Sequence, residues 1–177
     1  AGKERHFFTF MSKVHRGGRI AIISHNDLDG VASVKVVNEV LQADFIRFID
    51  YIDINEVLVA ELKENKITKV VFTDLSIENA KVIFAIERFA DILIIDHHLI
   101  RWDFNSRHTV YLNAQGYCSS YLCYYLFFKM QDISYLDWIV ACACLSDWIY
   151  LKSERWLKET YKSHKVPFSS EVNKLKK

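Results

Sequence analysis

Residues 19–30 read RIAIISHNDLDG, and this stretch joins an apolar segment to a cluster of polar residues. Arg19–Ser24 is an almost continuous apolar run, which is typical of a strand covered on both faces. His25, Asp27 and Asp29 then alternate, so an extended backbone would direct their side chains to the same side. Gly30 allows the chain to turn sharply into a following helix. The stretch therefore predicts a strand that ends in polar side chains and continues into a helix.

Outward from this stretch, β-type and helix-type patterns alternate through the first two thirds of the chain. Strands are predicted at 19–24, 45–49, 69–73, 92–95 and 109–112, and helices at 31–42, 54–65 and 78–89. This order predicts an α/β fold, doubly wound, with a mainly five-stranded parallel sheet and helices on both faces. Apolar residues at helical spacing add an N-terminal helix over 3–16, which ends at Gly17-Gly18, and helices near 119–129 and 135–148.

Polar residues recur where the predicted strands end. Asp74 follows the strand at 69–73, and Asp96, His97 and His98 follow the strand at 92–95. The carboxyl ends of parallel strands share one edge of a sheet, and ligands bind there at the point where strand order reverses. Taken singly, Asp29, Asp74 and Asp96 could be helix caps or loop residues, and the histidines an exposed pair. Their equivalent positions instead favour convergence on one site.

Carboxylates with a few imidazoles are ligands for hard divalent cations. They favour Mn²⁺ or Mg²⁺, although Co²⁺ or Zn²⁺ also fits. Several carboxylates share a small volume only if cations offset their repulsion, and two ions would do so. The sequence therefore predicts a two-metal site of the kind that activates water and stabilises a phosphoryl group.

Composition limits the remaining possibilities. At 177 residues and 51% hydrophobic, the chain can bury one sizeable core. The formal charge of +1 gives no global attraction to nucleic acid, but eight Lys or Arg stand against three Glu from Lys152 onward. Cys118, Cys123, Cys142 and Cys144 lack zinc-site spacing and are expected to be reduced thiols. Without a membrane-length apolar run or a signal peptide, we expect a soluble, cytoplasmic protein with no membrane partner.

Four motifs resemble a known family. ISHNDLDGVAS (23–33), VVFTDLS (70–76), IIDHH (94–98) and CLSDW (144–148) match, in order and rough spacing, the four N-terminal motifs of the DHH phosphoesterase superfamily. The match covers about residues 19–150. Members include RecJ-like single-strand exonucleases, oligoribonucleases, cyclic-dinucleotide phosphodiesterases and family II inorganic pyrophosphatases. The resemblance implies metal-dependent hydrolysis of a phosphoester, usually with two manganese ions.

The resemblance also implies roles for individual residues. One ion would be held by His25, Asp27 and Asp74, and the second by Asp29, Asp74, His97 and Asp147, so that Asp74 is shared. Asp147 could alternatively be a structural residue at a helix end. The catalytic residues would be His98, Asp74 and Asp96, with Asp96 orienting His97 and with His98 facing the scissile phosphate as hydrogen-bond donor or general acid. Asn113, Ser119 and Ser120 are candidates for contact with the substrate phosphate, beside His98.

The resemblance leads to a domain prediction. We expect residues 1–150 to form the DHH catalytic domain and 151–177 a basic helical linker or tail, with the family's C-terminal substrate-binding domain absent. The basic tail could attract a nucleic-acid backbone or be a solvated linker helix. The aromatic residues between Tyr117 and Phe128 could stack bases, but their spread around a helix favours core packing. Trp102 stays a candidate stacking residue.

The expected function is hydrolysis of phosphodiester bonds in single-stranded DNA, RNA or a short oligonucleotide. A manganese-dependent pyrophosphatase and a cyclic-dinucleotide phosphodiesterase are alternatives within the same enzyme class. A non-catalytic nucleic-acid-binding or replication-scaffold module is the alternative from another class, since some relatives have lost metal ligands. No motif position here carries an apolar replacement, which argues against that loss.

Overall fold

The computed structural model describes residues 2–168, and a parallel five-stranded sheet lies at its centre. The strands are β1 (Arg19–Ser24), β2 (Phe45–Phe48), β3 (Ile67–Thr73), β4 (Asp91–Asp96) and β5 (Thr109–Asn113). Their order is β2-β1-β3-β4-β5, and every neighbouring pair is parallel. The predicted doubly wound α/β fold is therefore confirmed.

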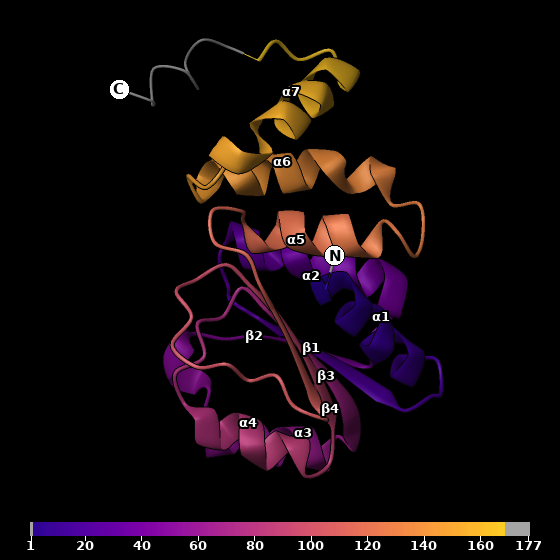
Figure 1. Ribbon diagram of the computed structural model, residues 1–177, viewed down its shortest axis with the longest axis vertical. Coiled ribbons are helices and arrows are strands. Elements are labelled where there is room, and N and C mark those ends of the chain that lie inside the picture. Colours follow the sequence, from indigo (N-terminus) through magenta and orange to yellow (C-terminus); the bar gives the residue numbers. More distant parts are fainter. Residues whose placement is uncertain (1, 169–177) are drawn as a thin grey trace.

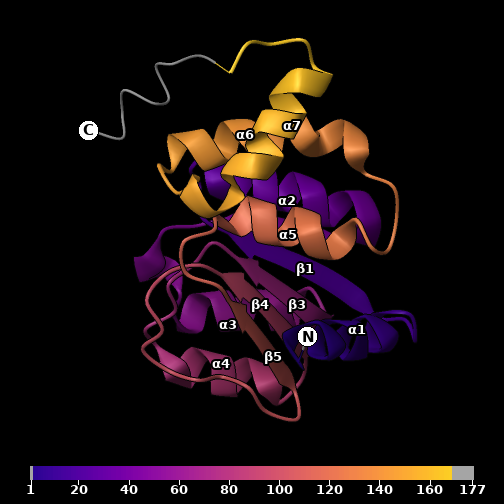
Figure 2. The ribbon, with the colours of Figure 1, turned by 45° about the horizontal axis from the view of Figure 1, so that its top comes forward.

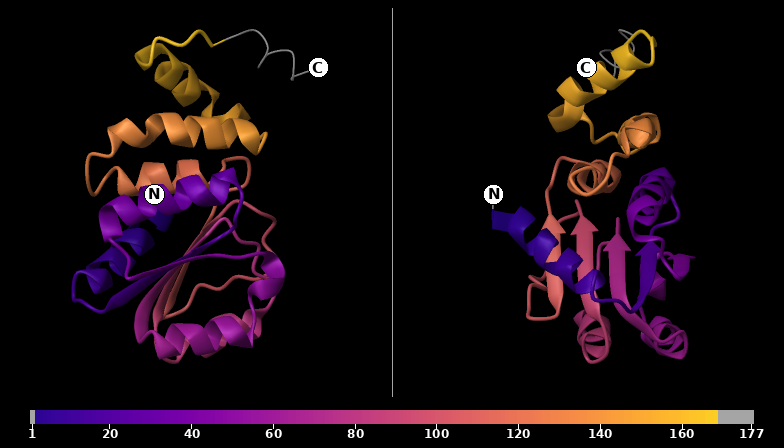
Figure 3. Two further views of the ribbon diagram at one scale, coloured as in Figure 1. Left: turned by 180° about the vertical axis from the view of Figure 1, so that it is seen from behind. Right: turned by 90° about the vertical axis from the view of Figure 1, so that its right-hand side faces the viewer.

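Helices cover both faces of the sheet (Figure 1). On one face lie α3 (Glu56–Glu64) and α4 (Ala80–Glu87), and on the other lie α1 (Gly2–Val14), α2 (Leu28–Leu41) and α5 (Ser119–Phe127). Beyond α2 and α5 lies α6 (Asp137–Ser146), and α7 (Glu154–Ser163) crosses in front of α6 toward α5 (Figure 2). The helix α1 lies over β4 and β5 and meets α5 through Phe7 and Phe127, whose ring centroids are 5.1 Å apart (Figure 3).

The alternation of side chains along the strands divides the core into two layers. Ile22, Val71 and Leu93 belong to the cluster under α1, α2 and α5. Their chain neighbours Ile23 and Phe72 belong to the cluster under α3 and α4. Because both faces of each central strand are buried, the strands read as continuous apolar runs in the sequence.

Strand order reverses between β1 and β3, which lie side by side. From β1 the chain winds to β2 on one side and then returns to β3 on the other. Two buried hydroxyls join the carboxyl ends of these strands, because Thr73 Oγ1 donates to Ser24 Oγ at 2.8 Å and Ser24 Oγ lies 3.0 Å from the carbonyl oxygen of Thr73. The residues that follow β1 and β3 therefore enter the same space, as expected at a topological switch point.

One connection differs from the sequence-based expectation. The helix after β1 begins at Leu28 rather than near 31, because Asp27 caps it, so Asp29 lies in a helical turn and not in an extended segment. The crossover from β4 to β5, residues 97–108, contains no helix. Its Asn105 side chain instead accepts a hydrogen bond from the N–H of Tyr111 at 2.9 Å, which protects the outer edge of β5.

Short 3₁₀ turns complete the described chain at Tyr51–Asp53, Ser134–Leu136 and Leu151–Ser153. The predicted basic tail forms the last of these turns and α7, and its residues 169–177 lie outside the described part of the chain. Among the residues described, no helix has the length and apolar character needed to cross a bilayer.

Candidate metal centre

Residues from four separate segments converge at the switch point. Three groups, among the residues described, have potential ligand atoms that all lie within 4.8 Å of one another. The groups are His25, Asp27 and Asp74; Asp29, His97 and Asp147; and Asp74, His97 and His98. Asp74 and His97 each belong to two groups, so the groups form one continuous cluster.

Asp27 and His25 follow β1 at the start of α2. The Asp27 carboxylate caps this helix by accepting a hydrogen bond from the N–H of Gly30 at 2.9 Å. Its second oxygen lies 2.8 Å from Nδ1 of His25. Burial alone would raise the pKa of Asp27, but the Gly30 N–H and His25 outweigh it and hold the pKa below its usual value.

Gly30 is required here by close packing rather than by backbone freedom. A Cβ at this position would lie 2.1 Å from the carbonyl oxygen of His25, which is a backbone atom and cannot move aside cheaply. Gly30 thus permits the turn of the chain predicted from the sequence, and it does so by letting the first turn of α2 approach His25.

Asp74 occupies the strained position directly after β3. Its φ of 58° lies in the left-handed region, which costs a non-glycine residue roughly 1–2 kcal/mol and which Asp and Asn tolerate best. Its N–H donates to the carbonyl oxygen of Ile95 at 3.1 Å, which ties it to β4. Burial, followed by the charges of Asp29 and Asp27, raises the pKa of Asp74 to about 10. Its Oδ2 is buried without a hydrogen-bond partner among the described residues.

Asp29 binds the amino end of α5, a contact that spans 90 residues of sequence. Its two oxygens accept hydrogen bonds from the N–H groups of Ser119 and Ser120 at 2.7 and 2.9 Å. Free N–H groups and the helix dipole favour a negative charge at this end of a helix. Asp29 is therefore a cap, but of α5 and not of the helix in which it lies.

The prediction that Ser119 and Ser120 contact substrate phosphate does not agree with the structure. Both side chains are completely buried, and both backbone N–H groups are used by Asp29. These residues therefore hold Asp29 in place and offer no surface to a ligand.

His97 points from the end of β4 into the carboxylate cluster. Its Nε2 lies 3.2 Å from Asp74 Oδ1, 3.5 Å from Asp147 Oδ2 and 3.8 Å from Asp29 Oδ2. Asp147 is the C-cap residue of α6. Burial and the charge of Asp29 raise its pKa, and its Oδ2 has no hydrogen-bond partner among the described residues.

The structure corrects the role of Asp96, which orients His98 rather than His97. Asp96 Oδ1 lies 2.7 Å from His98 Nδ1. Side chains at i and i+2 of an extended segment share a side, whereas His97 points away from Asp96 and toward Asp74. The contact with Asp96 raises the pKa of His98. Asn113 supports this pair, since its Nδ2 donates to the His98 carbonyl oxygen at 2.8 Å.

Tyr51, in the turn after β2, was not predicted to belong to the site. Its ring stacks on His25 with centroids 4.8 Å apart, and its hydroxyl lies 3.3 Å from His98 Nε2. Burial, followed by the charge of Asp74, raises the pKa of Tyr51 to about 12, so the hydroxyl stays protonated at neutral pH. In the sequence, the indication that Tyr51 could belong to the site was its position just after the carboxyl end of a predicted strand.

The cluster fits divalent cations. Burial, followed by the charges of neighbouring carboxylates, raises the pKa values of Asp74 and Asp147. Two buried carboxylate oxygens have no hydrogen-bond partner among the described residues, and buried polar atoms normally have one. Oxygen ligands with a minority of imidazoles suit Mn²⁺ or Mg²⁺.

A parallel α/β domain with a carboxylate and imidazole cluster at its switch point is the class that fold and site define. The family model for the DHH family, N-terminal domain, matches residues 19–146. The chain therefore belongs to the DHH family, as its four motifs indicated. Among curated proteins, no sequence matches the chain.

Solved structures share the fold at low sequence identity. The structure of exonuclease RecJ bound to manganese matches with a TM-score of 0.69 and 14% identity, over 92% of this chain and 48% of that one. RecJ in complex with Mn²⁺ from Thermus thermophilus gives 0.60 and 15%, over 82% and 24%. CDC45 from Entamoeba histolytica gives 0.66 and 14%, over 90% and 37%. The chain thus spans about half or less of each of these proteins.

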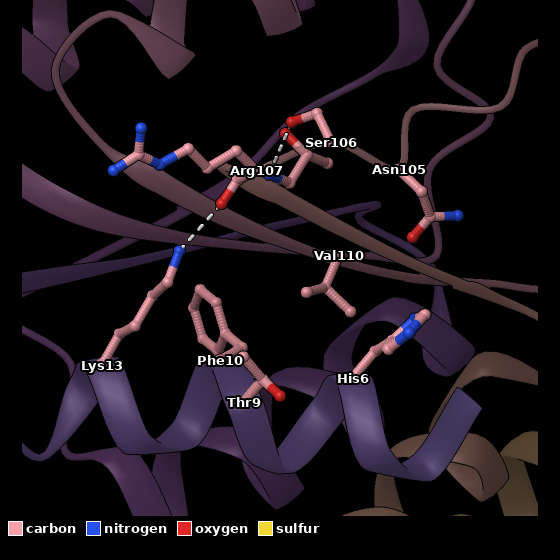
Figure 4. A pocket seen from close by; sticks show the side chains of 9 residues that line it. His6, Thr9, Phe10, Lys13, Asn105, Ser106, Arg107 and Val110 are labelled. Carbon is pink, nitrogen blue, oxygen red and sulfur yellow. Dashed lines mark hydrogen bonds between the residues drawn. The ribbon is translucent and has the colours of Figure 1, made fainter. Parts of the chain in front are cut away.

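A separate cavity of about 350 Å³ lies between α1 and the segment that precedes β5 (Figure 4). Basic side chains of His6, Lys13 and Arg107 line it beside Phe10 and Val110. Lys13 donates to Asp91 Oδ1 at 2.7 Å and to the Arg107 carbonyl oxygen at 3.0 Å. Lys13 therefore fastens α1 to the sheet, and none of the metal-centre residues lines this cavity.

Proposed function

We propose that this DHH domain is the catalytic part of a metal-dependent phosphodiesterase that hydrolyses single-stranded or short nucleic acid. The observation that carries the proposal is the convergence of Asp27, Asp29, Asp74 and Asp147 on His25 and His97, with buried carboxylate oxygens left unpaired among the described residues. Such a cluster is unstable without cations and well suited to holding them.

In this proposal His25, Asp27 and Asp74 hold one ion, and Asp29, Asp74, His97 and Asp147 hold the second. Two divalent ions bound there would supply Lewis-acid activation of water and neutralise charge on a phosphoryl group. Manganese is the proposed ion, in keeping with the ligand chemistry and with the manganese in both RecJ structures.

His98 is proposed to act directly on the substrate. It is half-buried at the edge of the cluster, with Asp96 2.7 Å from its Nδ1 and the Tyr51 hydroxyl 3.3 Å from its Nε2. The contact with Asp96 raises the pKa of His98, and a histidine with a raised pKa can donate a proton to a leaving oxygen. Asp96, Asn113 and Tyr51 would position it.

Exposed aromatic residues that lie close to metal-centre residues in the sequence favour nucleic acid over pyrophosphate as substrate. Tyr51 follows β2, Trp102 lies four residues beyond His98, and Trp148 directly follows Asp147. These side chains are 43%, 56% and 64% exposed. Bases stack on exposed aromatic rings, whereas pyrophosphate gains nothing from them.

The test is release of nucleotides from a labelled single-stranded oligonucleotide in the presence of Mn²⁺. Asp74→Asn should lower the rate by on the order of 100-fold or more, because it weakens both proposed ion sites. Asp132→Asn, a matched change at an exposed turn, should leave the rate unchanged. Full activity of Asp74→Asn would contradict the proposal.

The same preparation separates the alternatives. Release of phosphate from pyrophosphate without cleavage of the oligonucleotide would favour a pyrophosphatase. Hydrolysis confined to a cyclic dinucleotide would favour a cyclic-dinucleotide phosphodiesterase. Oligonucleotide binding without any manganese-dependent hydrolysis would favour a non-catalytic module.

A further inference from the structure

A groove lined by aromatic rings lies between α5 and α7. Its volume is about 270 Å³, and its lining residues, which we call the aromatic groove, are Tyr121, Tyr124, Tyr125, Phe128, Lys129 and Trp156. Tyr125 and Phe128 are each 46% exposed, although aromatic side chains usually lie mostly buried. Core packing, the preferred interpretation from the sequence, therefore holds for Phe127 but not for these two residues.

The rings form a continuous series along α5. Tyr117 stacks on Tyr121 with centroids 5.6 Å apart and planes 10° from parallel. Trp156 of α7 then contacts Tyr121 at 5.0 Å and Tyr124 at 5.5 Å, and Tyr124 contacts Phe128 at 5.7 Å. Successive bases of a single strand can stack on such a series regardless of sequence.

The series begins beside the metal centre. Tyr117 lies two residues before Ser119, whose N–H binds Asp29. On the other side, Lys152 lies five residues after Asp147 and donates to the carbonyl oxygen of Gln115 at 2.7 Å, with its ammonium 5.5 Å from the Tyr117 ring. A strand leaving the metal centre along α5 would therefore meet Tyr117 and Lys152 first.

The charge around the groove suits a polyanion. Residues 115–131 and 151–165 together contain six Lys or Arg and two Glu, whereas the whole chain has a net charge of only +1. Within α7, Arg155 pairs with Glu159 and Lys158 with Glu154, each at 3.2 Å, and Lys129 bonds to Glu4 at 2.6 Å. The basic residue nearest the start of the ring series is Lys152, whose ammonium lies 5.5 Å from the Tyr117 ring. Phosphate groups prefer such a basic border beside a stacking surface.

We propose that the aromatic groove binds the bases of a single-stranded nucleic acid whose backbone passes from the metal centre along α5. This inference rests on the proposed function for its substrate class and adds a second binding surface to it. Phe128 and the side of the Tyr125 ring away from Lys129, whose ammonium lies 4.0 Å from the ring centroid, would stack bases. Lys152 at the entry and Lys129 at the far end would meet the phosphates.

The experiment measures the affinity of the full chain for a fluorescently labelled oligothymidylate long enough to span the site and the groove. Tyr125→Ala and Phe128→Ala should each weaken binding about 5- to 100-fold, the range expected for loss of one stacked base. Phe128→Trp should retain affinity, because it keeps a stacking ring, and this rescue would not follow from a purely structural role. Phe84→Ala, at an exposed ring on α4 across the sheet, should bind as the wild type does.

The inference would be overturned if both alanine variants bound with affinities within about twofold of wild type and had unchanged melting temperatures. That result would favour a protein as the ligand of the groove. Hydrolysis of a dinucleotide, which is too short to reach from the metal centre into the groove, reports on the proposed function separately. If the wild type hydrolyses the dinucleotide but neither alanine variant binds the oligothymidylate more weakly, this inference alone fails. If binding depends on the groove but nothing is hydrolysed, the groove is supported and the proposed function fails.

Discussion

Asp74 combines three properties that rarely occur together in one residue. It has a left-handed backbone, a buried side chain with an unpaired oxygen among the described residues, and a raised pKa. Each property lowers stability, and strain of this kind is concentrated at functional sites. A pair of cations shared by Asp74 would relieve the electrostatic part of it.

His97 and His98 are neighbours in sequence with opposite surroundings. His97 faces Asp74, Asp147 and Asp29, whereas His98 faces Asp96 and Tyr51. The motif alone indicated that both histidines belong to the site. Which of them Asp96 would orient depends on the direction of each side chain at the end of β4, and this is a property of the backbone rather than of the motif.

At this scale we predict the pH dependence of Asp96→Asn. Asp96 raises the pKa of His98, and a protonated His98 is the proposed acid, so activity should be lost as pH rises through that pKa. An amide at position 96 removes the charge, which lowers the pKa of His98 and moves the alkaline limb of the rate profile to lower pH. The maximal rate should also fall by roughly 10- to 100-fold.

Rates of hydrolysis measured across a pH series for wild type, Asp96→Asn and the control Asp132→Asn check this prediction. An alkaline limb that stays at the same pH in Asp96→Asn would show that Asp96 does not act through His98.

Among the elements, α5 is joined to the metal centre by its amino end. The N–H groups of Ser119 and Ser120 hold Asp29, while residues of the same helix line the aromatic groove. Apolar periodicity sufficed to predict the strands, most helices and the edge where the site lies. It could not predict that Asp29 binds α5, because that contact joins residues 90 positions apart. The N–H groups that Asp29 binds have no partner that the sequence pattern would indicate.

The two aspartates should therefore affect stability in opposite directions in the metal-free protein. Asp29→Ala uncaps α5 and should lower the free energy of unfolding by about 1–2 kcal/mol. Asp74→Asn keeps a residue that tolerates the left-handed backbone and removes the cost that burial and the neighbouring carboxylates impose on an ionisable group, so it should raise that free energy by about 0.5–2 kcal/mol.

Urea unfolding of both variants in the presence of a chelator measures these changes. A loss of stability in Asp74→Asn comparable with that in Asp29→Ala would contradict the assignment of electrostatic repulsion to Asp74.

For the whole molecule, the cluster links stability to pH and to metal. The folded-state pKa of Asp74 is raised from 3.8 to about 10, and that of Asp147 is also raised. Their stabilising contribution is fully present below the unfolded-state pKa, near 4, and is lost as pH rises toward the folded-state value. The metal-free protein should therefore become less stable as pH increases through the neutral range.

Bound Mn²⁺ requires deprotonated carboxylates and removes their mutual repulsion, so the metal-bound protein should escape this loss. The increase in melting temperature caused by Mn²⁺ should thus be larger at about pH 8 than at about pH 6. Thermal unfolding with Mn²⁺ and with a chelator checks this. A metal-induced increase in melting temperature that becomes smaller as pH rises would contradict this link between stability, pH and metal.

The central claim is a two-ion site shared through Asp74, and calorimetric titration of Mn²⁺ into the metal-free chain near neutral pH tests it most directly. We predict saturation at two ions per chain with release of protons, and loss of binding at both positions in Asp74→Asn but not in Asp132→Asn. Absence of manganese binding by the wild type, or an unchanged titration of Asp74→Asn, would contradict the account.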